Sequence, residues 1–160
     1  MRPLGGRRTF ILRTTCLQFA LAVVASSAAQ EPRDKAAKEE LAKLEGTWRL
    51  VSGEIDGRKV PRGDIKDVSM VIRGDRVTIA EGKQISQAEI RVNPAAKPKQ
   101  IDTKYLSGPE KGFTALGIYE LDGNTLRICH TSKAKPKRPE KLETAENSRL
   151  VLAVWQRAMK

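Results

Sequence analysis

The sequence predicts an all-β fold of many short strands. Apolar residues recur at every second position in about eight short runs between Trp48 and Gln156. Turn signals such as Asp56-Gly57, Gly74-Asp75 and Asn93-Pro94 separate these runs at short intervals. Alternating strands with frequent turns are typical of β-sandwiches and β-barrels. No alternation of strands with long helical patterns, no internal repeat and no second domain is visible.

The first 29 residues have the features of an export signal peptide. Four arginines and no acidic residue accompany an apolar run from Leu17 to Ala25, which is too short to span a bilayer. Ser27-x-Ala29 fits a cleavage site before Gln30. Arg7-Arg8 resembles a twin-arginine signal, although paired arginines also occur in ordinary secretory signals. We therefore expect an exported protein, periplasmic or extracellular, with no retained transmembrane helix and with its export route left open.

Residues 30–43 are a charged, alanine-rich lead-in to the β-rich domain, which spans residues 44–158. Apolar residues such as Leu41 fall at helical spacing, Asp34 can cap the start, and Gly46 can end the helix. The apolar stripe is narrow. We expect a short helix that closes one end of the domain.

The hairpin between residues 117 and 130 can be predicted in register from its loop. With Gly123-Asn124 as a two-residue loop, Asp122 faces Thr125. The pairs on one face are then Leu121–Leu126, Tyr119–Ile128 and Gly117–His130, and those on the other are Glu120–Arg127 and Ile118–Cys129. The first set is mostly apolar and the second contains an opposite-charge pair, which supports this register. Tyr119, Ile128 and His130 are expected inside, with Cys129 outside or in a minor contact.

Several segments occur in one order that is similar to a known family. They are Leu44 to Trp48, Ser52 to Gly57, Pro98 to Asp102, Gly108 to Gly112, Gly117 to Leu126 and Arg138-Pro139. The chain resembles a lipocalin-like domain family of uncharacterised function that is expanded in planctomycete bacteria. The resemblance covers nearly all of residues 44–157. It implies an eight-stranded antiparallel lipocalin-like barrel with a short N-terminal helix.

Gly46-x-Trp48 also resembles the Gly-x-Trp signature of true lipocalins. In that signature the tryptophan lies near the closed end of the barrel, and an arginine from the last strand packs over its ring. Arg157 is the matching residue, and such a contact contributes about 0.5 to 2 kcal/mol. The resemblance thus implies a structural role for Gly46, Trp48 and Arg157. Lys141 stands where the family usually has a phenylalanine-type residue, so the resemblance does not determine the shape of the barrel's open end.

No residue pattern predicts catalysis, a cofactor or a metal site. His130 is the single histidine, and Cys129 beside it points to the opposite face of a strand, so the two cannot act on one ion or as a nucleophilic pair. Glu39 and Glu40 are expected on a solvated helix face. Phosphate loops and nucleophile elbows are absent from the sequence. We expect no enzyme, and we expect Cys129 to be a half-buried apolar residue without an internal disulfide.

The chain is basic, with a formal net charge of +11 that falls to +7 when the four arginines of residues 1–29 are removed. A basic surface favours anionic partners, although solubility alone is its commoner meaning. The run from Lys133 to Lys141 is predicted to be an exposed loop, because Pro136 and Pro139 interrupt it. It lacks the interleaved aromatic residues that stack on bases, so specific nucleic-acid binding is not predicted.

Two hypotheses of function remain. The first is a non-enzymatic module that binds a small, largely apolar ligand inside the barrel, lined by Tyr105, Tyr119, Ile128 and His130. The second is a structural or interaction module with a filled barrel, whose basic surface contacts anionic envelope polymers or partner proteins. A cavity of several hundred cubic ångströms favours the first, and close packing favours the second. The ligand and the oligomeric state are not decided by the sequence.

Overall fold

The computed structural model of the chain describes residues 30–132 and 137–159. The expected signal peptide, residues 1–29, and residues 133–136 of the basic run lie outside the described residues. The elements in chain order are α1 (Gln30–Leu44), β1 (Gly46–Ile55), β2 (Arg58–Lys59), α2 (Arg62–Ile65), β3 (Val68–Arg73), β4 (Arg76–Glu81), β5 (Gln84–Asn93), β6 (Gln100–Tyr105), β7 (Thr114–Asp122), β8 (Thr125–Thr131) and β9 (Leu150–Arg157).

Eight of the strands close into an antiparallel barrel. From β3 to β9 each strand pairs with the next along the chain, while β1 pairs with both β3 and β9 and so completes the circle. The two-residue strand β2 pairs with the end of β1. The predicted all-β barrel with an N-terminal helix is therefore confirmed. Closure pairs the strands that would otherwise be sheet edges.

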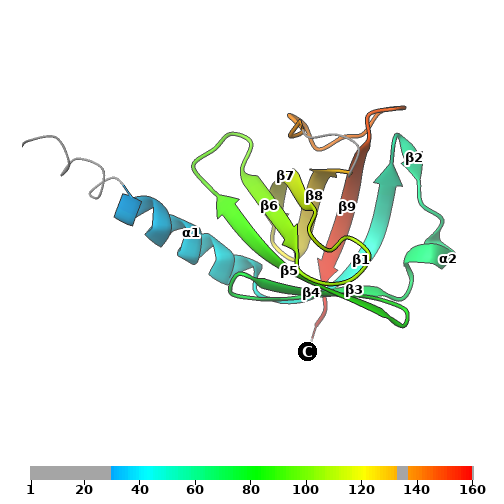
Figure 1. Cartoon of the computed structure of the whole chain (residues 1–160), viewed down its shortest axis with the longest axis horizontal. Coiled ribbons are helices and arrows are strands. Elements are labelled where there is room, and N and C mark those ends of the chain that lie inside the picture. The colour runs from blue at the N-terminus through cyan, green and yellow to red at the C-terminus, as the bar shows by residue number, and fades with distance from the viewer. Residues whose placement is uncertain (1–29, 133–136, 160) are drawn as a thin grey trace, which may run out of the picture.

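The barrel has two different ends. At the closed end, α1 leads directly into β1, and Leu44 and Trp48 are fully buried. Figure 1 shows α1 at this end, with β2 and α2 on the far side of the barrel. The second end, which we call the open end, carries the β1–β2 hairpin, α2 and the turn between β4 and β5. The helix thus closes one end as predicted, although Asp34 lies within α1, which begins at Gln30, and not at its cap.

The predicted hairpin register is confirmed at every pair between Gly117–His130 and Asp122–Thr125. Tyr119 and Ile128 belong to the core, as expected. Cys129 faces outward but is fully buried, not half-buried. The reason is that residues 137–149 pass over this part of β8, and the Cys129 thiol lies 3.5 Å from the carbonyl oxygen of Glu143.

Candidate functional site

A small cavity lies at the centre of the barrel. Its volume is about 60 Å³, and its lining is mostly aliphatic, with Thr103, Tyr105 and His130 as the polar exceptions. The wall between β6 and β8 is formed by small residues, because Ala115 lies opposite Thr103 and Gly117 lies opposite His130. A Cβ atom on Gly117 would lie 3.0 Å from Cβ of His130. Glycine at this position therefore allows the imidazole to lie close against the wall.

The cavity is small compared with the pockets that hold organic ligands. Such pockets measure roughly 300–1,000 Å³, whereas one liquid water molecule takes about 30 Å³. A volume of about 60 Å³ is thus close to that of two water molecules. The interior of the barrel is nearly filled by its own side chains.

Three of the four residues predicted to line a ligand site meet at this cavity. Tyr105, Ile128 and His130 line it, whereas Tyr119 lies at the closed end. The ring of Tyr105 stacks on Phe113 at 6.4 Å between centroids, and burial, with Glu110 and Glu81 nearby, raises the pKa of Tyr105 to about 12. Its hydroxyl and that of Thr103 form no hydrogen bond with another described residue. These two hydroxyls are therefore available to a molecule in the cavity.

His130 is held in a neutral form. Burial lowers the pKa of His130 from its ordinary value of 6.5. Its Nδ1 atom lies 3.1 Å from the carbonyl oxygen of Thr131, so the neutral ring with hydrogen on Nδ1 donates to that carbonyl. The second ring nitrogen is then an acceptor. The polar groups of the cavity are neutral, which favours a neutral occupant over an ion.

At the closed end, Arg157 packs over Trp48 as the resemblance implies. The guanidinium carbon lies 4.2 Å from the ring centroid, and the indole N–H of Trp48 donates to the carbonyl oxygen of Leu44 at 2.9 Å. Arg157 also donates to the carbonyl oxygens of Lys43, at 2.8 Å, and Glu45. Gly46 has φ of +134°, and a Cβ atom there would lie 2.7 Å from Arg157 Nη1. Position 46 therefore favours glycine for two reasons: the positive φ of its backbone, and the short distance to the guanidinium of Arg157.

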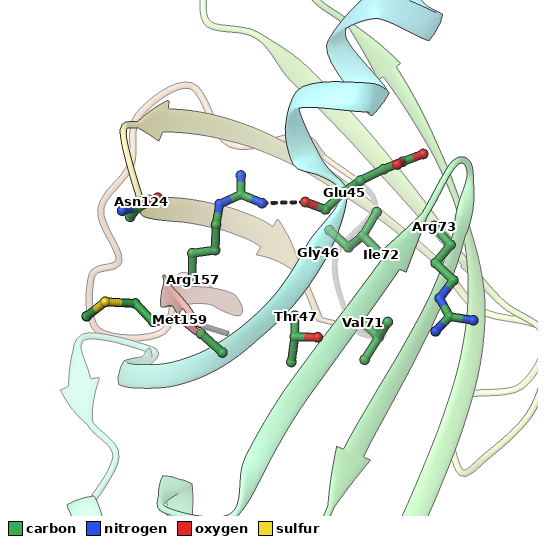
Figure 2. Close-up of a pocket in the computed structure, with 10 residues that line it drawn as sticks. Glu45, Gly46, Thr47, Val71, Ile72, Arg73, Asn124, Arg157 and Met159 are labelled. Carbon is green, nitrogen blue, oxygen red and sulfur yellow. Dashed lines mark hydrogen bonds between the residues drawn. The ribbon is translucent and has the colours of Figure 1, made fainter.

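A groove of about 680 Å³ lies beside Arg157, on the outside of the closed end (Figure 2). Two of its polar side chains already have partners. Arg157 binds the two carbonyl oxygens, and the carboxylate of Glu45 accepts a hydrogen bond from the backbone N–H of Gly74 at 2.9 Å. Thr47, Arg73 and Asn124 also line the groove, and their exposed side chains form no hydrogen bond or ion pair with another described residue.

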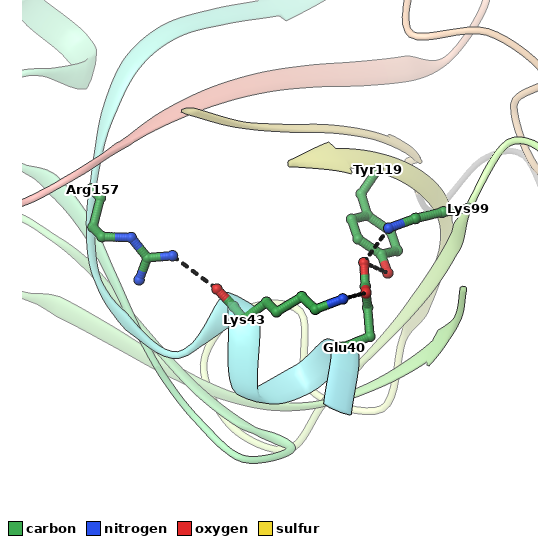
Figure 3. A network of polar contacts seen from close by, with 5 residues as sticks. All are labelled: Glu40, Lys43, Lys99, Tyr119 and Arg157. Atoms are coloured by element: carbon green, nitrogen blue, oxygen red, sulfur yellow. Dashed lines mark hydrogen bonds and ion pairs between the residues drawn. The ribbon is translucent and has the colours of Figure 1, made fainter. Parts of the chain in front are cut away.

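Glu40 is buried, not solvated as the sequence analysis predicts, and is only 3% exposed. Figure 3 shows its carboxylate between Lys99, Lys43 and Tyr119. Lys43 Nζ lies 3.0 Å from it, the Tyr119 hydroxyl donates to it at 3.1 Å, and Lys99 forms a short ion pair with it. Burial alone would raise the pKa of Glu40, but these three hydrogen bonds outweigh burial and lower it.

The sequence does contain a signal for this burial that the prediction missed. Glu40 lies four residues before Leu44 and therefore on the same face of α1. Leu44 is fully buried at the closed end. The face that carries Glu40 is thus the one that meets the barrel. What the helix alone could not reveal is that Lys99 and Tyr119 lie opposite this carboxylate.

The basic surface divides into paired and unpaired cations. Arg138, in the run predicted as an exposed loop, is held against the barrel: it donates to the carbonyl oxygen of Gly117 at 2.6 Å and forms an ion pair with Asp102 at 2.6 Å, outside hydrogen-bond geometry. By contrast, the exposed Lys59, Arg62 and Lys66 form no ion pair with any residue of the described chain. These three lie on or beside β2 and α2 at the open end.

The remaining reactive groups show no arrangement for chemistry. Burial raises the pKa of Cys129 to about 11, so its thiol stays protonated at neutral pH and is a poor nucleophile. Within residues 30–132 and 137–159, no three His, Cys, Asp or Glu side chains lie together as metal ligands. Over the same ranges, no helix has the length and apolar character needed to cross a membrane.

Comparisons of the chain with family models, with curated proteins and with solved structures find no match.

Proposed function

We propose that the chain is an exported, non-enzymatic interaction module, in which a nearly filled barrel is the scaffold and the basic surface contacts an anionic envelope polymer. The observation that carries this proposal is the cavity of about 60 Å³. It lies well below the roughly 300–1,000 Å³ of pockets for organic ligands. A larger partner therefore has to bind on the outside of the barrel, where the net charge is positive.

The segment from Arg58 to Lys66 is the best candidate for this contact. Lys59, Arg62 and Lys66 are exposed and have no ion-pair partner among the described residues, and Asp64 is the one acidic residue in the segment. Arg58 pairs with Glu146 at 3.7 Å, but both side chains are largely exposed, so water and salt weaken that pair. Unpaired cations attract a polyanion without first breaking an internal ion pair.

Chromatography on an immobilised polyanion such as heparin tests the proposal. We expect the exported chain to be retained at low salt and to elute as salt rises, because salt screens exposed charges. The triple variant Lys59→Gln, Arg62→Gln and Lys66→Gln should elute at clearly lower salt. Its matched control, Arg33→Gln, Lys35→Gln and Lys38→Gln, removes the same charge from α1, at the opposite end (Figure 1).

Two results would count against the proposal. Absence of retention at low salt would remove the anionic polymer as partner. An equal shift in both triple variants would show that binding follows net charge and not the Arg58–Lys66 segment. Equal melting temperatures of the three proteins would establish that the variants remain folded.

A second candidate function is a carrier for a very small ligand. It is favoured by the hydroxyls of Thr103 and Tyr105, which face the cavity without a partner among the described residues, and by the neutral imidazole of His130. Native mass spectrometry of the protein purified from its own envelope separates the candidates. A reproducibly bound small molecule supports the carrier. A protein free of small molecules that is retained on polyanions supports the interaction module.

A further inference from the structure

The groove beside Arg157, which we call the closed-end groove, has the size of a ligand pocket (Figure 2). Its volume of about 680 Å³ lies within the roughly 300–1,000 Å³ of pockets that hold small organic molecules, whereas the cavity inside the barrel measures about 60 Å³. It lies on the outside of the closed end, so a molecule can reach it without entering the barrel. A small ligand is therefore better accommodated in the closed-end groove than inside the barrel.

Backbone hydrogen bonds fix the walls of the closed-end groove. The N–H of Arg157 donates to the carbonyl oxygen of Asn124 in the β7–β8 turn, and the N–H of Ala158 donates to the carbonyl oxygen of Thr47 in β1, both at 2.8 Å. Thr47 is in turn paired with Val71 across β1 and β3. Because three parts of the chain are joined in this way, the groove is already formed without a ligand, which lowers the entropy cost of binding one.

The guanidinium of Arg157 is held in place on one side of this groove. It packs on the ring of Trp48 at 4.2 Å and donates to the carbonyl oxygens of Lys43 and Glu45. A guanidinium has five N–H donors, so others remain without a hydrogen-bond partner among the described residues. A cation that is already fixed loses little side-chain entropy when it binds an anion.

The unused polar groups of the groove are mainly hydrogen-bond donors. Its backbone carbonyl oxygens accept the hydrogen bonds given above. By contrast, the exposed guanidinium of Arg73, the amide of Asn124 and the hydroxyl of Thr47 have no partner in the described part of the chain. Figure 2 shows Arg157 and Arg73 on opposite sides of the groove, with Thr47 and Val71 between them. The groove therefore suits a ligand that accepts hydrogen bonds.

The charges of the lining favour an anion. Among the described residues that line the groove, Arg73 and Arg157 are the cations and Glu45 is the only acid. One carboxylate oxygen of Glu45 already accepts the backbone N–H of Gly74 at 2.9 Å. The lining thus has a net positive charge. Arginine pairs well with a carboxylate, because two of its N–H groups can donate to the two oxygens side by side.

We propose that the closed-end groove binds a sugar unit that carries a carboxylate, as in a uronic acid. The carboxylate pairs with the arginines of the lining. The ring hydroxyls exchange hydrogen bonds with Asn124 and Thr47, whose side chains both donate and accept. The C–H groups of the ring pack on Val71 and Met159. A neutral sugar would leave the arginines unused, and a carboxylate without hydroxyls would leave Asn124 and Thr47 unused.

This site goes beyond the proposed contact of the Arg58–Lys66 segment, which lies at the open end of the barrel. The carboxylate can belong to a free sugar acid or to the end of an acidic polysaccharide, since both present the same unit to the groove. Water screens the charges of an exposed groove, so binding of a single unit should be weak, with a Kd on the order of 1 mM.

Titration of the ¹⁵N-labelled exported chain with glucuronate, followed by NMR, tests the site. We expect the Nε–H signal of Arg157 and the amide signals of Thr47, Arg73 and Asn124 to shift before those of the Arg58–Lys66 segment. Glucose lacks the carboxylate and acetate lacks the ring, so each should bind at least about fivefold more weakly. Absence of these shifts in a large excess of glucuronate, or equal shifts with glucose, would overturn the proposal.

A matched pair of variants separates the groove from general attraction by positive charge. Arg73→Gln should raise the Kd for glucuronate about fivefold, because it removes one cation of the lining. Lys104→Gln removes the same charge from an exposed position on β6, outside the groove, and should leave the Kd within about twofold. Equal weakening by both variants would mean that no specific site exists. Melting temperatures check that both variants fold.

Two further comparisons identify the source of the carboxylate and keep the proposals apart. An oligosaccharide that ends in glucuronate should bind at least as well as the free acid if the groove takes a polymer end, and should fail to bind if it takes the free acid. The triple variant Lys59→Gln, Arg62→Gln and Lys66→Gln should bind glucuronate as the parent chain does. Parent-like binding by that variant supports a separate closed-end site, whereas loss of binding would place the site at the open end.

Discussion

Two inward tyrosines on neighbouring strands show how differently the two ends of this barrel use their polar groups. At the closed end, Tyr119 is 2% exposed and its hydroxyl donates to Glu40 at 3.1 Å. In the open half, the hydroxyl of Tyr105 has no hydrogen-bond partner among the described residues, and its ring stacks on Phe113. Strand alternation predicts the same inward direction for both. The neighbouring elements decide that one tyrosine stabilises the fold and the other lines a cavity.

The difference arises from what covers each end. At the closed end, α1 contributes a carboxylate, backbone carbonyls and an apolar residue, so that Tyr119, Arg157 and Trp48 all find partners. In the open half, β7 contributes Ala115 and Gly117, whose small size leaves the polar groups of Thr103 and Tyr105 at a cavity. Loss of a partnered polar group at the closed end should therefore cost stability, and loss of an unpartnered hydroxyl at the cavity should cost little.

Trp48→Ala should have the largest effect. Removing a fully buried indole from the closed end should lower the free energy of unfolding by about 3–5 kcal/mol, because the space left behind cannot collapse fully. Urea denaturation followed by far-UV circular dichroism measures this change. Trp48→Phe, which retains an aromatic ring, should cost clearly less. A loss below about 1 kcal/mol for Trp48→Ala would contradict a central role of this end in stability.

Arg157→Met should come next, with a loss of about 1–3 kcal/mol. Methionine keeps apolar contact with the indole but loses the cation over the ring and both hydrogen bonds to the carbonyl oxygens of Lys43 and Glu45. Arg49→Met is the control, since Arg49 is an exposed strand arginine with no ion pair in the described structure, and should change stability by no more than about 0.5 kcal/mol. Equal losses in the same denaturation assay would show that the position over Trp48 is not special.

Glu40→Gln should destabilise by about 1–2 kcal/mol at neutral pH, because it weakens charge-assisted hydrogen bonds that a buried carboxylate makes. Lys43 and Lys99 are partly exposed and can return to water, which limits the loss. Glu39→Gln, one residue earlier on the exposed face of α1, should be close to neutral. Thermal melts of the two variants at pH 7 compare them directly.

The lowered pKa of the Glu40 carboxylate predicts how the free energy of unfolding depends on pH. Since the pKa of Glu40 is lower in the folded chain than its ordinary value of 4.5, the unfolded chain binds the proton first as pH falls. The contribution of Glu40 is therefore complete above pH 4.5 and is lost as pH falls below 4.5 toward the folded pKa. Glu40→Gln should flatten the stability curve in this window, whereas Glu39→Gln should follow the parent chain. A parallel curve for Glu40→Gln would contradict the lowered pKa.

The smallest expected change in the free energy of unfolding is that caused by removing the hydroxyl of either tyrosine. Tyr119→Phe removes the hydrogen bond to Glu40 and should cost about 1 kcal/mol, while Tyr105→Phe removes a hydroxyl without a described partner and should stay within about 0.5 kcal/mol. Both changes keep the ring, so packing is nearly constant. Chemical denaturation of both variants under one condition measures the difference. A reversed order would mean that the Tyr105 hydroxyl has an important partner in solution.

Local patterns in the sequence determined much of this architecture. Alternation with a period of two predicts the inward set, and Gly123-Asn124 predicts the β7–β8 register that the structure confirms pair by pair. Both succeed because strand direction and tight turns depend on residues that are close in the chain. The resemblance carried by Gly46-x-Trp48 likewise implies the contact between Arg157 and Trp48.

Only the tertiary structure shows which charged residues are buried or held against the barrel, and how much space is left inside it. Glu40 is buried because α1 meets Lys99, 59 positions further along the chain, and Arg138 is held by a carbonyl oxygen 21 positions before it. The cavity volume depends on the summed sizes of side chains from many strands. These properties depend on contacts between residues that are distant in sequence, and no short stretch of sequence contains both partners.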